Sequence, residues 1–218
     1  MWSLSHAVTL NNQGVGLLLQ HDHKGATTYF IDALSSVKQM LGGTQGGKRA
    51  VASNTPPALV HESTYNIPGF HDLNCFVFAS AITLSPNVKV SDAESINDIS
   101  AVILLNIALA YHHAGQVDRS LLTKAEHMYA TASEIATMNN DRRHGTCLLV
   151  KAAATNNLAQ IRHARGEYSH SLEGFNYLGS LFATFGQVIQ RTRVEQDVYQ
   201  GMLMNALLMT PPETAAAA

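Results

Sequence analysis

Histidine is the residue type in this chain whose spacing first suggests chemistry, because an imidazole can bind a metal ion or transfer a proton near neutral pH. The 218-residue sequence has 11 histidines, densest at His21-Asp22-His23 and at His112-His113. Metal ligands must share one face of an element or meet from separate elements. The adjacent His112 and His113 would project about 100° apart on a helix, and His21 and His23 fall at an expected turn. We therefore expect His21 and His23 to be solvated, and we expect no bound metal and no cofactor.

A glycine-rich segment matches part of a phosphate-binding loop, with Gly42, four further residues and then Gly47-Lys48. Such a loop surrounds a phosphate with backbone amides, follows a strand and places Ser or Thr after the lysine for magnesium. Here Arg49 holds that position, a helix is expected before the loop, and Pro56-Pro57 follow soon afterwards. The segment is interpreted as a glycine linker.

The sequence also contains no pattern typical of a catalytic serine or cysteine nucleophile. No Gly-x-Ser-x-Gly elbow occurs, and Cys147 falls in an apolar helical stretch, where a thiol is usually inert. Cys75 and Cys147 are far apart, which favours buried free thiols in a reducing compartment, with a disulfide as the alternative. We expect that the chain is not an enzyme. A metal-dependent enzyme that uses the histidine-rich spots is the remote alternative.

The charge and apolar content of the chain indicate which kinds of partner it can bind. Apolar residues make up 46% of the chain and charged residues 14%, and the net charge is −2. Without a basic excess there is no electrostatic driving force for nucleic-acid binding. Weakly charged surface favours contact with another macromolecule. No apolar run reaches the ~18 residues that span a bilayer, and the first residues carry no secretory signal. We expect an intracellular, cytoplasmic protein that binds neither nucleic acid nor membrane.

The elements that would position these residues are mainly helices, because apolar residues recur at three- and four-residue steps. Seven helices are expected, at about residues 5–20, 24–41, 93–114, 119–138, 142–165, 168–187 and 190–209. Residues 42–90 form an irregular insertion, in which 75–84 are expected to be extended and to pair with residues around 64–70. We expect one helical domain over 1–210 and a disordered tail over 211–218.

One block of residues occurs three times. It combines an asparagine near a small residue with a later pattern of small residues around an aromatic one. The copies are Asn12, Gly14, Ala26, Phe30, Ala33; Asn106, Ala108, Ala125, Tyr129, Ala132; and Asn157, Ala159, Ser171, Phe175, Leu178. Each copy predicts two helices packed as a hairpin, with the ring filling the space that the small residues leave.

These blocks resemble tetratricopeptide repeats. The third copy is nearest in spacing, with Gly166 at the turn, whereas the first copy has His21 where the turn glycine belongs. The asparagines are 94 and 51 residues apart, against the family's period of about 34. The resemblance implies an all-α fold, a degenerate tetratricopeptide-like α-solenoid of stacked antiparallel helical hairpins.

The resemblance also implies a site, since the first helix of each repeat in that family lines a concave groove. Asparagine at that position contacts the backbone or carboxylate of a bound peptide. By resemblance, the groove would be lined by Asn12, Asn106 and Asn157, with His112 and His163 one further turn along. The family's carboxylate clamp needs lysines where this chain has Val8, Val102 and Ala153, so recognition of chaperone tails is not supported. Asparagines that only hydrogen-bond between helices are an equal alternative.

These features together predict a protein-interaction scaffold that captures a peptide or a partner protein in a helical groove. The alternative is a structural subunit or self-associating component of a larger complex, and in that case a homo-oligomer is expected.

Overall fold

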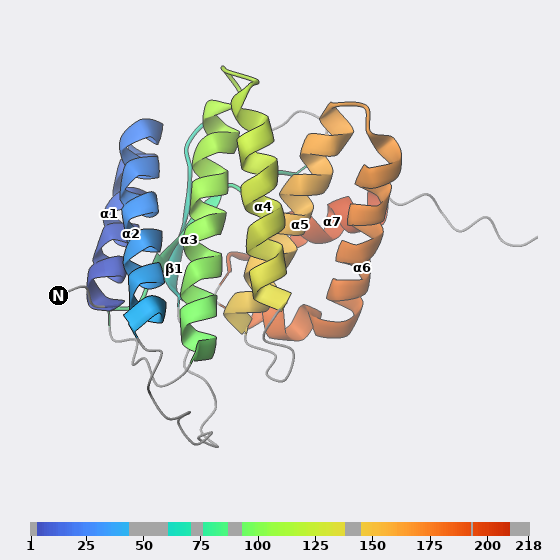
Figure 1. Cartoon of the computed structure of the whole chain (residues 1–218). Helices are drawn as coiled ribbons and strands as arrows, with labels where there is room; N and C mark the ends of the chain where they lie inside the picture. The colour runs from blue at the N-terminus through green and yellow to red at the C-terminus, as the bar shows by residue number, and fades with distance from the viewer. Residues whose placement is uncertain are drawn as a thin grey trace, which may run out of the picture.

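The computed structural model describes residues 4–43, 61–70, 76–86, 93–137, 145–192 and 194–209. This part of the chain is mostly helical, as predicted, with one small antiparallel sheet (Figure 1). The elements are α1 (Leu4–Leu19), α2 (His23–Gly43), β1 (His61–Asn66), β2 (Ser80–Leu84), α3 (Ala93–Ala114), α4 (Leu121–Thr137), α5 (Gly145–Ala164), α6 (Tyr168–Gln190) and α7 (Gln196–Leu208).

The helices lie side by side in chain order, from α1 and α2 to α6, and the two strands lie behind them in the view of Figure 1. Each of α1 to α6 contacts the next helix, and α1, α3, α5 and α7 also contact one another in that order. Strand β2 packs on α1 and α3. The odd-numbered helices therefore form one layer, and the sheet covers its outer side.

Ring-bearing residues fill the spaces between paired helices. Phe30, Tyr129 and Phe175 are almost completely buried, with at most 1% of each exposed. A Cβ atom placed on Gly14 would lie 2.6 Å from the Phe30 ring, so α1 and α2 approach closely because this position lacks a side chain. The alternation of small and aromatic residues read from the sequence corresponds to this packing.

Two of the turns between helices have the same main-chain hydrogen bonds. After α5, Gly166 N–H donates to His163 O and Glu167 N–H to Arg162 O; after α1, the corresponding bonds of His21 and Asp22 go to Leu18 O and Leu17 O. Gly166 has φ 79° and His21 has φ 63°, so both adopt the left-handed conformation. Glycine adopts that conformation without strain, whereas histidine there costs free energy.

The predicted extended segment is confirmed. Strand β2 lies within residues 75–84, and it pairs antiparallel with β1, with Tyr65 opposite Ala81 and Asn66 opposite Ser80. The pairing continues beyond the strands, because Ile67 N–H donates to Ala79 O at 2.7 Å. The partner strand begins a few residues earlier than expected and ends before Pro68-Gly69, where Gly69 has φ 68°.

The end of the sixth helix and the start of the seventh differ from the prediction. The sixth helix runs on to Gln190 instead of ending near 187, and the seventh begins at Gln196. Ile189 is fully buried, and the Thr192 hydroxyl donates to Ile189 O at 2.6 Å, so the core contact extends the helix and the hydroxyl ends it.

Several predicted features lie outside the described residues. They are the Gly47-Lys48 portion of the glycine-rich loop, Cys75 and the tail 211–218. Cys147 is described, and its buried thiol donates to Asp98 Oδ1 at 2.7 Å. Within the described ranges, no helix combines the length and apolarity needed to cross a bilayer.

Candidate functional site

Four asparagines form a row across the odd-numbered helices, one on each of α1, α3, α5 and α7. The side-chain amide of each makes two hydrogen bonds to the main chain of a single residue in the extended segment 76–84. The pairs are Asn12 with Leu84, Asn106 with Ile82, Asn157 with Phe78 and Asn205 with Phe76, with N···O distances of 2.7–3.0 Å. The structure thus brings together the three asparagines singled out from the sequence and adds a fourth.

This row acts as a substitute for a neighbouring strand. Residues 78, 82 and 84 bond to asparagines, while 79, 81 and 83 lie on the β1 side of the segment. In a strand, the main-chain groups of successive residues point to opposite edges. A primary amide carries the same donor and acceptor as a peptide group, so it can pair with both groups of one residue. The asparagine amides therefore bond only to main-chain atoms of the segment and do not select its side chains.

A second set of asparagines supports the row. Asn11 donates to Ile82 O at 3.1 Å and accepts from Asn106 Nδ2 at 2.9 Å. Asn156 on α5 makes the same pair of bonds with α7. It donates to Phe76 O at 3.0 Å and accepts from Asn205 Nδ2 at 2.7 Å. The sequence interpretation missed Asn11, Asn156 and Asn205. The signal for the first two was the doublet Asn-Asn, which recurs at both places.

The occupant of the row is part of the hydrophobic core. Phe78, Ile82 and Leu84 are fully buried. Burying a large apolar side chain contributes about 1.5–3 kcal/mol each. A partner that used the same amides would first have to displace this segment.

The two histidines expected beside the row lie in different surroundings. His112 is buried, and its Nδ1 lies 3.2 Å from the Tyr129 hydroxyl, which itself accepts from Asn157 Nδ2 at 2.9 Å. The Tyr129 hydroxyl therefore links His112 of α3 to Asn157 of α5. Burial raises the pKa of the Tyr129 phenol, so the hydroxyl stays neutral. His163 lies in the last turn of α5, and its ring packs edge-on against Tyr168.

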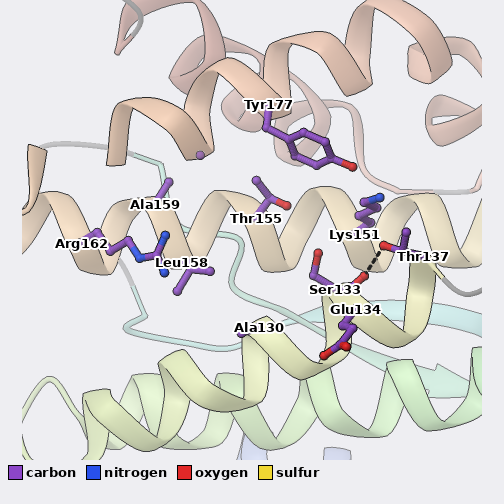
Figure 2. A pocket seen from close by; sticks show the side chains of 11 residues that line it. Ala130, Ser133, Glu134, Thr137, Lys151, Thr155, Leu158, Ala159, Arg162 and Tyr177 are labelled. Atoms are coloured by element: carbon purple, nitrogen blue, oxygen red, sulfur yellow. Dashed lines mark hydrogen bonds between the residues drawn. The ribbon is translucent and has the colours of Figure 1, made fainter. Parts of the chain in front are cut away.

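An open groove lies on the other side of the helix layer, between α4 and α6, with α5 as its floor (Figure 2). Its volume is about 420 Å³. Its lining residues are Ala130, Ser133, Glu134 and Thr137 of α4; Lys151, Thr155, Leu158, Ala159 and Arg162 of α5; and Gly174 and Tyr177 of α6. The floor is small and apolar, and charged side chains stand at its borders.

Two contacts shape this groove. A Cβ on Gly174 would lie 2.8 Å from Ala159 Cβ, so small residues let α6 approach α5. The Lys151 ammonium lies 5.1 Å from the centre of the Tyr177 ring, where the negative ring face attracts it. Tyr177 is 44% exposed, so this pair is available at the surface.

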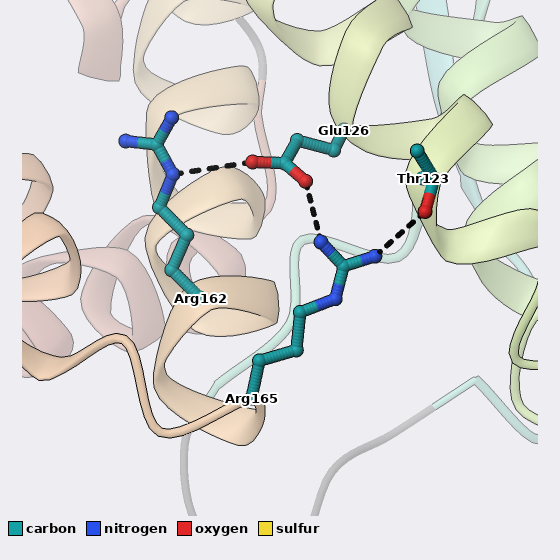
Figure 3. A network of polar contacts seen from close by, with 4 residues as sticks. All are labelled: Thr123, Glu126, Arg162 and Arg165. Carbon is teal, nitrogen blue, oxygen red and sulfur yellow. Dashed lines mark hydrogen bonds and ion pairs between the residues drawn. The ribbon is translucent and has the colours of Figure 1, made fainter.

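An ion-pair network joins α4 to α5 and includes Arg162, which also lines the groove (Figure 3). The Glu126 carboxylate on α4 accepts from Arg162 Nε at 3.3 Å and from Arg165 Nη1 at 2.5 Å, and Arg165 also donates to Thr123 at 3.2 Å. These side chains are partly exposed, so each pair contributes less than about 1 kcal/mol. Their effect is to hold α4 and α5 in register beside the groove.

A third arrangement joins histidines from distant parts of the chain. His21, His23 and His113 place one ring nitrogen each within 4.8 Å of one another. The sequence interpretation considered these residues as two separate spots, because it had no means of placing the end of α3 beside the turn after α1.

Comparisons with protein-family models, curated proteins and solved structures found no match.

Proposed function

We propose that this chain is a protein–protein interaction module, built as a degenerate tetratricopeptide-like stack of helical hairpins. The observation that supports partner binding is the open groove between α4 and α6. The row formed by Asn12, Asn106, Asn157 and Asn205 supports the repeat architecture, because each odd-numbered helix contributes one asparagine to it. The repeated use of one side chain on the odd-numbered helices fits the repeat architecture that the sequence resembles.

In this chain the asparagine row is occupied internally. Its amides are saturated by residues 76–84, and His112 is turned to Tyr129. We therefore assign the row to holding the chain's own segment and assign partner binding to the open groove between α4 and α6. No catalytic role is part of the proposal.

The groove fits one segment of a partner protein. Leu158 and Ala159 offer an apolar floor, and Lys151 and Arg162 stand at its borders. The proposed partner segment carries an apolar anchor for the floor and an acidic residue for the basic border. Such an anchor supplies most of the binding energy in a typical interface.

Replacing Ala130 with arginine tests the groove. Ala130 is exposed on α4 and lines the groove, so a long charged side chain there should fill the space without disturbing the core. Partners would be captured with the tagged full-length chain from native extract, identified, and then titrated in purified form by calorimetry. The Ala130→Arg variant should bind at least about tenfold more weakly, a loss of about 1.4 kcal/mol.

The matched control is Ala183→Arg. Ala183 is exposed on α6. It lies about two and a half helical turns after Gly174, so it is on the opposite face of the helix and points away from the groove. This variant should bind the partner as the unmodified chain does. Equal binding by both variants, with unchanged helicity, would show that the partner does not use the groove.

A second candidate function, self-association within a larger complex, is favoured by the last helix. Met204, Leu207 and Leu208 of α7 are 48%, 63% and 72% exposed. The terminal unit of a helical repeat array normally presents a polar outer face. If these side chains drive association, sedimentation across concentrations should show an oligomer without added ligand, and Leu207→Lys with Leu208→Lys should return the chain to a monomer.

A further inference from the structure

Three histidines converge where the turn after α1 meets the end of α3. His21 lies in the turn, His23 begins α2 and His113 ends α3. Their ring centres are 4.6 Å apart for His23 and His113, 5.6 Å for His21 and His113, and 6.3 Å for His21 and His23. Each offers one nitrogen, and the three nitrogens all lie within 4.8 Å of one another.

Two of these rings have polar atoms that nothing in the described part of the chain satisfies. The Nδ1 atoms of His23 and His113 are buried and make no hydrogen bond there. Buried polar side-chain atoms are hydrogen-bonded in the large majority of cases, so two such atoms in one cluster require an explanation. Phe70 stacks on His113 with ring centres 5.0 Å apart and shields it on one side.

The backbone provides a second, independent observation. His21 has φ 63° in a turn whose counterpart after α5 carries Gly166 with φ 79° and the same pair of main-chain hydrogen bonds. Glycine would occupy this position without strain. A strained non-glycine residue indicates a local role when its side chain meets a cluster of chemically active groups. The strain at His21 brings its imidazole to the other two.

We propose that His21, His23 and His113 bind one divalent transition-metal ion, for which Zn²⁺ is the probe. Neutral imidazole is a preferred ligand of zinc, copper and nickel. Zinc binds histidine nitrogen at about 2.0–2.1 Å, which places the nitrogens of a tetrahedral site ~3.3 Å apart. The three nitrogens lie within 4.8 Å of one another, so metal binding requires each pair to approach by at most about 1.5 Å.

Neighbouring groups are consistent with an all-histidine site. The Asp22 carboxylate accepts from Gly25 N–H at 2.9 Å, so it caps α2. Burial, followed by the charges of His23 and His21, lowers the pKa of His113 to about 4, and burial also lowers the pKa of His23.

The ion would connect the turn after α1 and the start of α2, which are adjacent in the chain, to the end of α3, which is distant in sequence. It would hold the turn between α1 and α2 against the end of α3, in addition to the apolar contacts there. Three protein ligands leave a fourth position of a tetrahedral ion open. That position would take water or a donor atom from another molecule.

The experiment uses the full-length chain without an affinity tag, treated with a chelator and then titrated with ZnCl₂ by calorimetry at pH 7.5. We expect one ion per chain with a dissociation constant in the micromolar range or below, and a higher melting temperature with zinc. Co²⁺ in place of zinc should give the visible absorption bands of a tetrahedral site. Absence of saturable zinc binding by the unmodified chain would overturn the proposal.

Variants separate this site from ordinary surface binding. His21→Gly should weaken zinc binding at least about tenfold while raising the melting temperature in chelator, since it removes a ligand and relieves the turn. His21→Asn keeps a residue that tolerates the left-handed conformation and should lose binding to the same extent. The exposed His127 and His170 are the controls, and His127→Ala and His170→Ala should bind zinc as the unmodified chain does. Unchanged binding in both His21 variants would refute the assignment.

Discussion

Replacing Asn106 with alanine should destabilise the fold by about 3–5 kcal/mol. Asn106 is fully buried, accepts from Ile82 N–H at 2.9 Å, and donates to Ile82 O at 2.8 Å and to Asn11 Oδ1 at 2.9 Å. In the variant the Ile82 carbonyl keeps a donor, because Asn11 Nδ2 also reaches it at 3.1 Å. The Ile82 N–H and Asn11 Oδ1 lose the partner that Asn106 supplied. Each buried unpaired group costs about 1–3 kcal/mol, and the small cavity adds to that sum.

Equilibrium urea denaturation followed by far-ultraviolet circular dichroism measures this change. The matched control is Asn176→Ala on the exposed face of α6, which should change the free energy of unfolding by less than about 0.5 kcal/mol. Native-state hydrogen exchange adds a local readout, because the Ile82 amide should exchange faster in the Asn106 variant. A loss below about 1 kcal/mol, with the Ile82 amide still protected, would refute the view that the row holds segment 76–84 in place.

Four further substitutions test the packing and the ion pairs. Phe175→Ala should cost about 3–5 kcal/mol in the same urea assay, because the ring is 1% exposed and leaves a cavity; a cost near zero would contradict its place in the core. Gly14→Ala should lower the melting temperature, since the new Cβ would lie 2.6 Å from the buried Phe30 ring, whereas Gly16→Ala in the same helix has open space and should be neutral or stabilising by up to about 1 kcal/mol. Glu126→Gln should change stability by less than about 1 kcal/mol, and a larger loss in calorimetric scans would mean that its ion pairs are stronger than their exposure indicates.

The helices and their hairpin contacts were predictable because they depend on local spacing. Apolar residues at three- and four-residue steps specify which face of a helix is buried. The rings of Phe30, Tyr129 and Phe175 were expected to fill gaps beside small residues, and they are buried as expected. The end of α6 was placed too early, at about 187, although Ile189 continues the apolar stripe of that helix by a four-residue step and is buried in the core.

The candidate sites were predictable only in part. The repeated asparagines were noticed because they recur at the same place in each block, and the structure does gather Asn12, Asn106 and Asn157 into one row. Asn205 lies outside the three blocks, and its role follows only from the path of the segment it binds. The groove between α4 and α6 has no sequence signature, since it results from the spacing of two helices across a third.

The order of residues along this chain settles where the main chain coils, where a ring meets a small side chain, and where an amide recurs, because these properties act over a few residues. The tertiary structure determines which segment the asparagine amides bind and which histidine side chains lie close together. The segment bonded to Asn106 is 24 residues away in the chain, and Asn11 of the same cluster is 95 residues away. His113 likewise reaches His21 and His23 only through the packing of α3 on α2. Contacts at such separations depend on the closure of long loops around a shared core, and no local pattern encodes them.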